Sequence, residues 1–144
     1  MSRNTVVIGG TESDSHVVSI YLADLFLQEL GYRVLNRSCQ NTVEELLHVE
    51  GVEDDVLAII VVNQNGQALD DLKNLKTCKD RLPPQVPVIL GGHYWVGCER
   101  SDAYIERLRK YGVDYMLDAI EELDGTLKAV ARNFAGVGKA AVAA

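Results

Sequence analysis

The sequence predicts one α/β domain, a parallel sheet of five strands with helices on both faces. Short apolar runs alternate with segments of helical periodicity along the 144 residues, which is the pattern of repeated strand–helix units. The most hydrophobic run, Val56–Val62, does not alternate with polar residues. Central parallel strands, buried on both faces, have this character. The composition, 47% hydrophobic and 24% charged, is that of a globular domain.

The first half of the chain predicts two strand–helix units. An apolar strand over residues 5–8 ends in a Gly-Gly turn, and a loop carrying Asp14 and His16 follows. Residues 17–30 predict an amphipathic helix that ends at Gly31, with apolar side chains at helical spacing at Val18, Leu22, Leu25, Phe26 and Leu30. After a short strand over 32–35, Thr42 begins a second helix, and Glu45 three residues later completes a capping box. Its apolar face contains Val43, Leu46, Leu47 and Val49.

The second half predicts three further strands and their helices. Val56–Val62 ends in a polar loop, 63–67, and a helix over 68–79 runs toward three prolines at 83, 84 and 87. A strand over 88–90 then leads into Gly91-Gly92. Ser101 caps a helix over 101–111 that Gly112 ends, and a strand over 113–117 and a helix over 120–134 follow. Residues 136–144 are expected to be a flexible tail, so the single domain spans 1–135.

The expected strand order is 2-1-3-4-5, the doubly wound, three-layer arrangement called flavodoxin-like. The first and third strands are the most apolar and should therefore be the most central, and each crossover should be right-handed. The carboxyl ends of the strands then meet at one edge, where open α/β sheets bind ligands. This edge gathers residues 9–16, 63–67, 91–95 and 118–119.

Charge and cysteine content exclude several classes of function. A net charge of −7 and a pI near 4.9 argue against nucleic acid or an anionic membrane as the main partner. No apolar segment reaches the ~20 residues of a membrane helix, and we expect no secretory signal. Cys39, Cys78 and Cys98 form no C-x-x-C pair, which indicates reduced thiols and a cytoplasmic location.

The Asp14-x-His16 pair is the strongest candidate for chemistry. A carboxylate two residues from an imidazole can accept a hydrogen bond from one ring nitrogen, which leaves the other as a more basic lone pair. One histidine cannot build a zinc or iron site alone, but it can ligate a metal whose other positions come from a macrocycle. The alternative is a surface aspartate with an incidental histidine near a helix start.

Gly91-Gly92 either lets the backbone approach a flat ligand closely or forms a simple tight turn. We expect Tyr94 and Trp95 to pack against the following helix rather than cover a ligand, and His48 and His93 to be exposed.

Taken together, Asp14-x-His16, the helix after it and Leu90-Gly91-Gly92 resemble the cobalamin-binding domain shared by carbon-skeleton mutases and methionine synthase. The resemblance is strongest to the small subunit of glutamate (methylaspartate) mutase and runs from Thr5 to about Phe134. Residues 13–18 resemble the cobalt-ligating loop of that subunit. Residues 66–67 and 91–97 match its third and fourth loops.

The resemblance implies that His16 is the lower axial ligand of cobalt and that Asp14 orients it. The displaced nucleotide tail of the cofactor would lie between the first loop and the sheet. The implied cofactor is adenosylcobalamin. The implied partner is a larger catalytic TIM-barrel subunit in a hetero-oligomer, because this domain is too small to enclose both cofactor and substrate. The cofactor-binding residues implied are Ser13, Asp14, Ser15, His16, Val17, Ser19, Val62, Asn63, Gln64, Gly66, Gly91, Gly92, His93 and Asp118. The chain would be an isomerase subunit that is inactive alone, with no catalytic residue of its own.

Three positions depart from the family pattern. Ser19 replaces the glycine of D-x-H-x-x-G, Val62 followed by Asn63 replaces a common serine, and residues 116–119 replace a Gly-Thr or Gly-Ser. Asp118 would repel a tail phosphate. The pattern therefore supports cobalt ligation better than tail binding.

Other functions stay open. A corrinoid carrier for methyl transfer uses the same loop but usually has a helical domain before it, and we expect none here because the first strand begins at about residue 5. A flavodoxin-like carrier would use the hydroxyls of Thr11, Ser13 and Ser15, but Glu12 and Asp14 oppose a phosphate there. A receiver domain would need a phosphorylatable aspartate at the end of the third strand. This chain has Asn63 there, which argues against that function. A diverged scaffold without cobalamin is the last alternative. The sequence does not predict the substrate.

Overall fold

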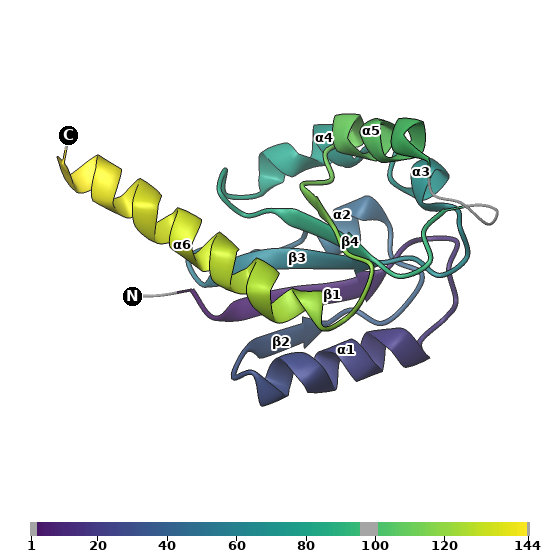
Figure 1. The fold of residues 1–144 in the computed structure, drawn as a ribbon, viewed down its shortest axis with the longest axis horizontal. Helices are drawn as coiled ribbons and strands as arrows, with labels where there is room; N and C mark the ends of the chain where they lie inside the picture. Colours follow the sequence, from purple (N-terminus) through teal and green to yellow (C-terminus); the bar gives the residue numbers. More distant parts are fainter. Residues whose placement is uncertain (1–2, 96–100, 144) are drawn as a thin grey trace.

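A five-stranded parallel sheet in the order β2-β1-β3-β4-β5 forms the centre of the computed structural model, which describes residues 3–95 and 101–143 (Figure 1). The strands are β1 (Thr5–Gly10), β2 (Arg33–Asn36), β3 (Val56–Val62), β4 (Val88–Gly91) and β5 (Tyr115–Met116). Every pairing in the sheet is parallel. The predicted fold class and strand order are confirmed.

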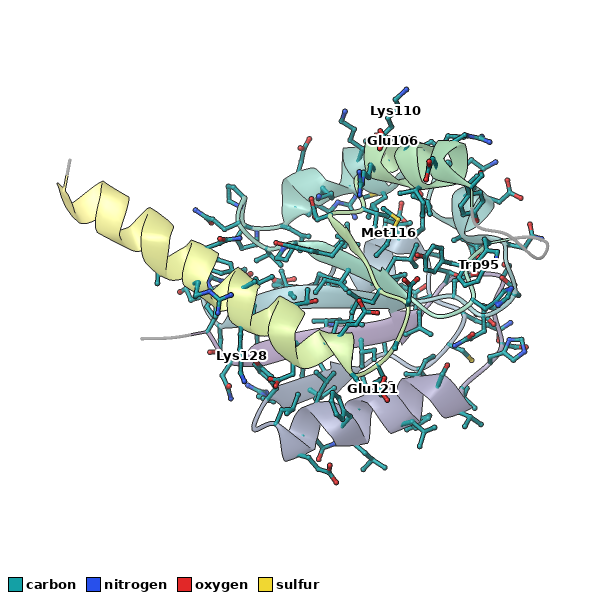
Figure 2. All side chains as sticks on the ribbon, viewed as in Figure 1. Trp95, Glu106, Lys110, Met116, Glu121 and Lys128 are labelled. Carbon is teal, nitrogen blue, oxygen red and sulfur yellow. The ribbon has the colours of Figure 1, made fainter. Side chains whose placement is uncertain are left out.

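Helices cover both faces of the sheet (Figure 1). One face carries α1 (Val18–Glu29) and α6 (Glu122–Ala143). The other carries α2 (Val43–Leu46), α3 (Ala68–Asp71), α4 (Leu75–Cys78), the 3-10 turn η1 (Lys79–Arg81) and α5 (Asp102–Tyr111). All residues of β1 and β3 are buried, and alternate side chains enter two separate cores. On the α5 side, Met116 packs against one of these cores (Figure 2).

The predicted helix caps are present. The Thr42 hydroxyl accepts from the Glu45 N–H while the Glu45 carboxylate accepts from the Thr42 N–H, which is the expected capping box. Ser101 accepts from the Tyr104 N–H at the start of α5, and Gly112 ends that helix with a left-handed φ of 112°. These signals are local, which is why the sequence revealed them.

Several boundaries differ from the sequence prediction, including that of β5, which spans Tyr115–Met116 rather than 113–117. β1 continues through Gly9 and Gly10, which were expected to form a turn. A Cβ on Gly9 would lie 2.7 Å from Leu46 Cδ2, so this glycine permits α2 to pack closely against the strand. The helix predicted over 68–79 is broken into α3, α4 and η1, and Asn74, between the first two, donates to Glu44 Oε1 on α2. Helix α6 extends to Ala143 rather than ending near residue 134.

Helix α1 forms where predicted, but it buries a different face from the one that the apolar spacing indicated. Val18, Leu22 and Leu25 are 70%, 57% and 60% exposed, whereas Ile20, Ala23 and Leu27 contact the sheet. Phe26 is partly buried, and Leu30 is exposed. The helix has two apolar stripes, and its position over β1 and β2 decides which of them is buried. Within residues 3–95 and 101–143, the large exposed hydrophobic side chains all belong to positions 17–30.

No helix among the described residues has the length and apolar character needed to span a membrane. Cys39 and Cys78 are free thiols, and Cys98 lies outside the described residues, as do Val96 and Gly97.

Candidate functional site

The Asp14–His16 pair forms at the carboxyl end of β1. His16 Nδ1 lies 2.6 Å from Asp14 Oδ1, and the same oxygen accepts from the His16 backbone N–H at 3.1 Å. Asp14 is 1% exposed, while the His16 side chain is 62% exposed. The loop therefore holds a buried carboxylate beneath an imidazole that solvent and ligands can reach.

This geometry fixes which ring nitrogen is available. An ionised carboxylate only accepts hydrogen bonds, so His16 Nδ1 is the donor to Asp14. In the neutral ring, Nε2 then carries the free lone pair. This is the donor arrangement that a histidine metal ligand requires.

Asp14 also ties the first loop to the third. Its Oδ2 accepts the backbone N–H of Gln64 at 2.5 Å, and its backbone N–H donates to the Thr11 carbonyl at 3.1 Å. Both carboxylate oxygens are thus engaged, and the carboxylate cannot rotate away from His16 without losing several hydrogen bonds. A hydrogen bond to a charged group contributes about 1.5–3 kcal/mol, so the loop positions the imidazole firmly.

A second network joins the same two loops. Asn63, which is fully buried, donates from Nδ2 to Thr11 Oγ1 at 2.8 Å and accepts the Gly66 N–H at 3.0 Å. Asn65 donates to the Ser13 carbonyl, and the Ser13 hydroxyl donates to Asp71 on α3. Ser13, Asn63 and Gly66 therefore shape the loops rather than line a cavity. Ser15 and Val17, on either side of His16, are exposed.

A cavity of about 300 Å³ opens between α1, the sheet and the start of α6. Its walls are mainly apolar, formed by Leu22, Ala23, Ile60, Val62, Ile89, Leu117, Ile120 and Leu123. Its polar side chains are Ser19, Gln64 and Asp118, and Gly91, Gly92 and Ala119 complete the lining. Gln64 lines the cavity and donates its backbone N–H to Asp14, so the cavity adjoins the Asp14–His16 loop.

Ser19 lines this cavity, and its hydroxyl oxygen is buried within the protein. Its Oγ is buried and has no hydrogen-bond partner among the described residues. A buried polar group without a partner costs about 1–3 kcal/mol. Native proteins therefore leave few such atoms.

The two glycines after β4 have different roles. A Cβ on Gly91 would meet no protein atom within 4 Å, and Gly91 lines the cavity, so a side chain there would take up space that a ligand could fill. Gly92 has a left-handed φ of 97°, and a Cβ there would lie 2.5 Å from the Asn63 carbonyl. The fold itself thus requires Gly92, whereas Gly91 keeps the cavity open.

The aromatic residues after β4 stay out of this cavity. Tyr94 is fully buried in the core beneath α5, as predicted, and its carbonyl accepts the Tyr104 hydroxyl. Trp95 lies near the edge of the sheet (Figure 2) and stacks on the exposed His93 ring at 4.2 Å between centroids. The His93 N–H donates to Gln64 Oε1, so His93 orients Gln64 rather than lining the cavity.

The amides at the start of α6 are already occupied. Glu122 Oε1 accepts from the backbone N–H groups of Asp118 and Ala119, both at 2.8 Å. Free amides at a helix start attract phosphate, but here a carboxylate of the chain binds them. Glu122 was not among the predicted site residues, although its spacing from Asp118 resembles a helix cap.

Among the residues described, no three histidine, cysteine, aspartate or glutamate side chains gather to hold a metal ion. Asp71 and Asn65 were also absent from the predicted site residues, because their roles depend on contacts more than 50 residues away in sequence.

No family model matches the chain, but several curated proteins are similar to it. The glutamate mutase sigma subunit of Halobacterium salinarum is 28% identical over 126 residues, which cover 88% of this chain and 84% of the relative. Glutamate mutase sigma subunit 1 of Haloarcula marismortui is 29% identical over a region that covers 80% of this chain and 76% of the relative. The glutamate mutase sigma subunit of Clostridium tetanomorphum is 25% identical over a region that covers 79% of this chain and 83% of the relative. The chain resembles the glutamate mutase sigma subunits.

Solved structures extend this sigma-subunit resemblance at the level of the fold. A cobalamin-binding protein from Desulfitobacterium hafniense superposes with a TM-score of 0.63 at 14% identity. A chain of a methanol:cobalamin methyltransferase complex from Methanosarcina barkeri superposes with a TM-score of 0.63 at 18% sequence identity. This chain covers 59% and 48% of those two chains. The receiver domain of an Arabidopsis thaliana histidine kinase also matches, with a TM-score of 0.59, so the fold alone does not assign a function.

Proposed function

We propose that the chain is the cobalamin-binding small subunit of an adenosylcobalamin-dependent carbon-skeleton mutase of the glutamate mutase type. The observation that carries the proposal is the exposed His16 imidazole, held through Nδ1 by the buried Asp14 carboxylate. The sequence resemblance to glutamate mutase sigma subunits selects the mutase over the methyl-transfer carrier, whose fold is similar.

The residues present fit a corrinoid. His16 Nε2 offers a nitrogen ligand to a metal whose equatorial positions a macrocycle fills. The walls of the adjoining cavity are mainly apolar and Gly91 keeps it open, which suits the heterocyclic base of a displaced nucleotide tail. In this proposal, the walls of the cavity come from α1, β3, β4 and the start of α6.

The bound cofactor would supply a cobalt–carbon bond that breaks homolytically, which is chemistry of the cofactor itself. The protein's own residues bind and orient it. Asp14 holds the His16 ring in one tautomer and one direction, and Gln64 anchors Asp14 through its backbone N–H. Outer partners of this kind tune a metal ligand, and their loss typically costs ~10–100-fold in affinity.

The proposal includes a larger catalytic subunit that covers the carboxyl edge of the sheet and supplies the substrate pocket. The relatives named above are subunits of glutamate mutase, which supports a hetero-oligomer. We also propose that the protein is cytoplasmic, as predicted from the sequence.

The test is a visible-absorbance titration of the purified chain with adenosylcobalamin and with hydroxocobalamin. We expect saturable binding with the spectrum of a base-off corrinoid ligated by histidine. His16→Ala should abolish this spectrum while the far-UV circular dichroism stays unchanged. His48→Ala removes an exposed histidine distant in sequence and should leave the titration as in the parent chain. Asp14→Asn should weaken binding by about 10–100-fold.

An unchanged spectrum in His16→Ala would refute the assigned role of His16. A protein that purifies with a bound flavin would instead favour the flavodoxin-like alternative.

A further inference from the structure

We infer that the outer face of α1 is a self-association surface, through which two copies of this chain pair as a weak, two-fold symmetric dimer. The outer face consists of Val18, Tyr21, Leu22 and Leu25, which are 70%, 51%, 57% and 60% exposed. The inference does not depend on the proposed function, since neither His16 nor Asp14 belongs to this face.

These four side chains form one continuous patch. Residues three and four positions apart lie on the same side of a helix, and this side is opposite to the one that contacts the sheet. Figure 1 shows α1 at the outside of the molecule, with no other described element over its outer face. Leu22 also lines the cavity beside α1, but Val18, Tyr21 and Leu25 do not. The cavity therefore does not account for their exposure.

The size of the patch fits a weak dimer. With Val17 at its edge, the exposed portions amount to roughly 500 Å² per copy, which is near the upper limit for the largest apolar patch of a typical monomer. Two copies that pair would remove about 1,000 Å² from water in total, the area of a reversible interface and less than that of an obligate dimer. We therefore expect a dissociation constant in the micromolar range.

The lack of charge on this face favours a second copy as the occupant. The chain has no lysine or arginine between Arg3 and Arg33. Asp24 is half-buried, and its carboxylate accepts hydrogen bonds from the side-chain amides of Gln28 and Asn36. The face thus offers no ion pair to a charged partner, whereas two copies can meet without burying an unpaired charge. Ordinarily the net charge of −7 would oppose self-association, and a neutral contact face limits that repulsion.

The spacing of the side chains is compatible with two-fold symmetry. An axis between Tyr21 and Leu22 would set the two α1 helices antiparallel, with Val18 of one copy against Leu25 of the other and Tyr21 against Leu22. Such a contact uses the same patch on both copies and closes on itself. Glu29, one turn after Leu25, would lie at the solvent-exposed rim.

The length of the patch distinguishes this dimer from a partner that covers only the loops. Leu25 lies nine residues after His16, about 13 Å along the helix axis from the carboxyl edge of the sheet. A catalytic subunit seated on that edge alone would leave Leu25 exposed. A second copy covers the whole patch.

The experiment is sedimentation equilibrium of the purified chain without cofactor, over about 1–500 µM protein. The average mass should rise with concentration from the 15.8 kDa of the monomer toward twice that value. Raising sodium chloride from about 50 to 500 mM should leave the dimer unchanged or strengthen it, because salt screens the repulsion between two acidic chains.

Two variants place a carboxylate in the patch, and one control places it elsewhere. Leu25→Glu and Tyr21→Glu should each raise the dissociation constant at least about tenfold, because each would bury an unpaired charge in an apolar contact. Ala103→Glu adds the same charge at an exposed position of α5, on the other face of the sheet, and should change the constant less than about twofold. Far-UV circular dichroism should match that of the parent in all three, since the altered positions are exposed.

Several outcomes would overturn the inference. A parent chain that stays monomeric at every concentration would show that the outer face of α1 does not bind its own copy, and would leave it to the catalytic subunit. Growth beyond a dimer would exclude a closed two-fold contact. Equal dimerisation of Leu25→Glu, Tyr21→Glu and the parent would place the interface elsewhere, and a dimer that weakens in salt would indicate charged contacts. None of these results would affect the cobalamin titration that tests the proposed function.

Discussion

Replacing Leu27 and Leu25 by alanine, one at a time, tests which face of α1 is buried. The two residues stand two positions apart, so they point to opposite sides of the helix. Leu27 is fully buried against the sheet, and Leu25 is 60% exposed. Both variants have the same change of side chain in the same helix, so any difference in stability reports the difference in burial.

The expected magnitudes are well separated. Leu27→Ala removes a buried side chain and leaves a cavity, which costs about 2–5 kcal/mol. Leu25 has less than half of its surface covered, and full burial of a leucine is worth about 1.5–3 kcal/mol. Leu25→Ala should therefore cost at most about 1 kcal/mol, partly offset by the higher helix propensity of alanine.

Urea unfolding followed by far-UV circular dichroism measures both free energies of unfolding. The slopes against urea should match that of the parent, because the surface exposed on unfolding changes little. A loss of stability in Leu25→Ala as large as in Leu27→Ala would show that α1 is rotated about its axis relative to this structure, and would refute the description of its exposed face.

Two further predictions concern the α2 side of the sheet. Thr42→Ala breaks the capping box of α2 and should lower the free energy of unfolding by about 1 kcal/mol in urea; an unchanged value would indicate that the cap is dispensable. Desolvation, and then the hydrogen bond and charge of Glu44, raise the pKa of the Cys78 thiol above its ordinary value of 9.0. In variants that each retain one cysteine, iodoacetamide should therefore alkylate Cys39 faster than Cys78, as measured by mass spectrometry. Because the folded state favours the protonated Cys78 thiol, its stabilising contribution is present below pH 9.0 and is lost as the pH rises through the raised pKa. Equal alkylation rates would contradict this account.

The helix and strand signals visible in the sequence depend on residues close to one another along the chain. The continuous apolar run Val56–Val62 predicted a central strand, and β3 is buried along its whole length. Thr42 with Glu45, and Ser101 with Gly112, marked helix ends that the structure also has. Each cap involves backbone groups within one helical turn, and the strand is a continuous run of apolar residues, so residues close together in sequence are enough to specify these features.

The contacts of the candidate site are also of two kinds, those between residues close in sequence and those between distant loops. Asp14 and His16 lie two residues apart, so their contact could be anticipated from spacing alone. By contrast, Gln64 reaches Asp14 across 50 positions of sequence, and Asp71 reaches Ser13 across 58. Such contacts depend on which loops the parallel strands bring to the same edge, and therefore on the strand order.

The sequence of this protein specified the doubly wound fold, the edge of the sheet at which the polar loops meet and the contact between Asp14 and His16 at that edge, since these follow from periodicity and from short spacings. The three-dimensional packing specified which apolar stripe of α1 is buried, that the buried Ser19 hydroxyl has no partner among the described residues, and that Glu122 occupies the amides before α6. These properties arise where α1, the sheet and α6 meet. Their free energies depend on contacts between distant segments, which no local pattern encodes.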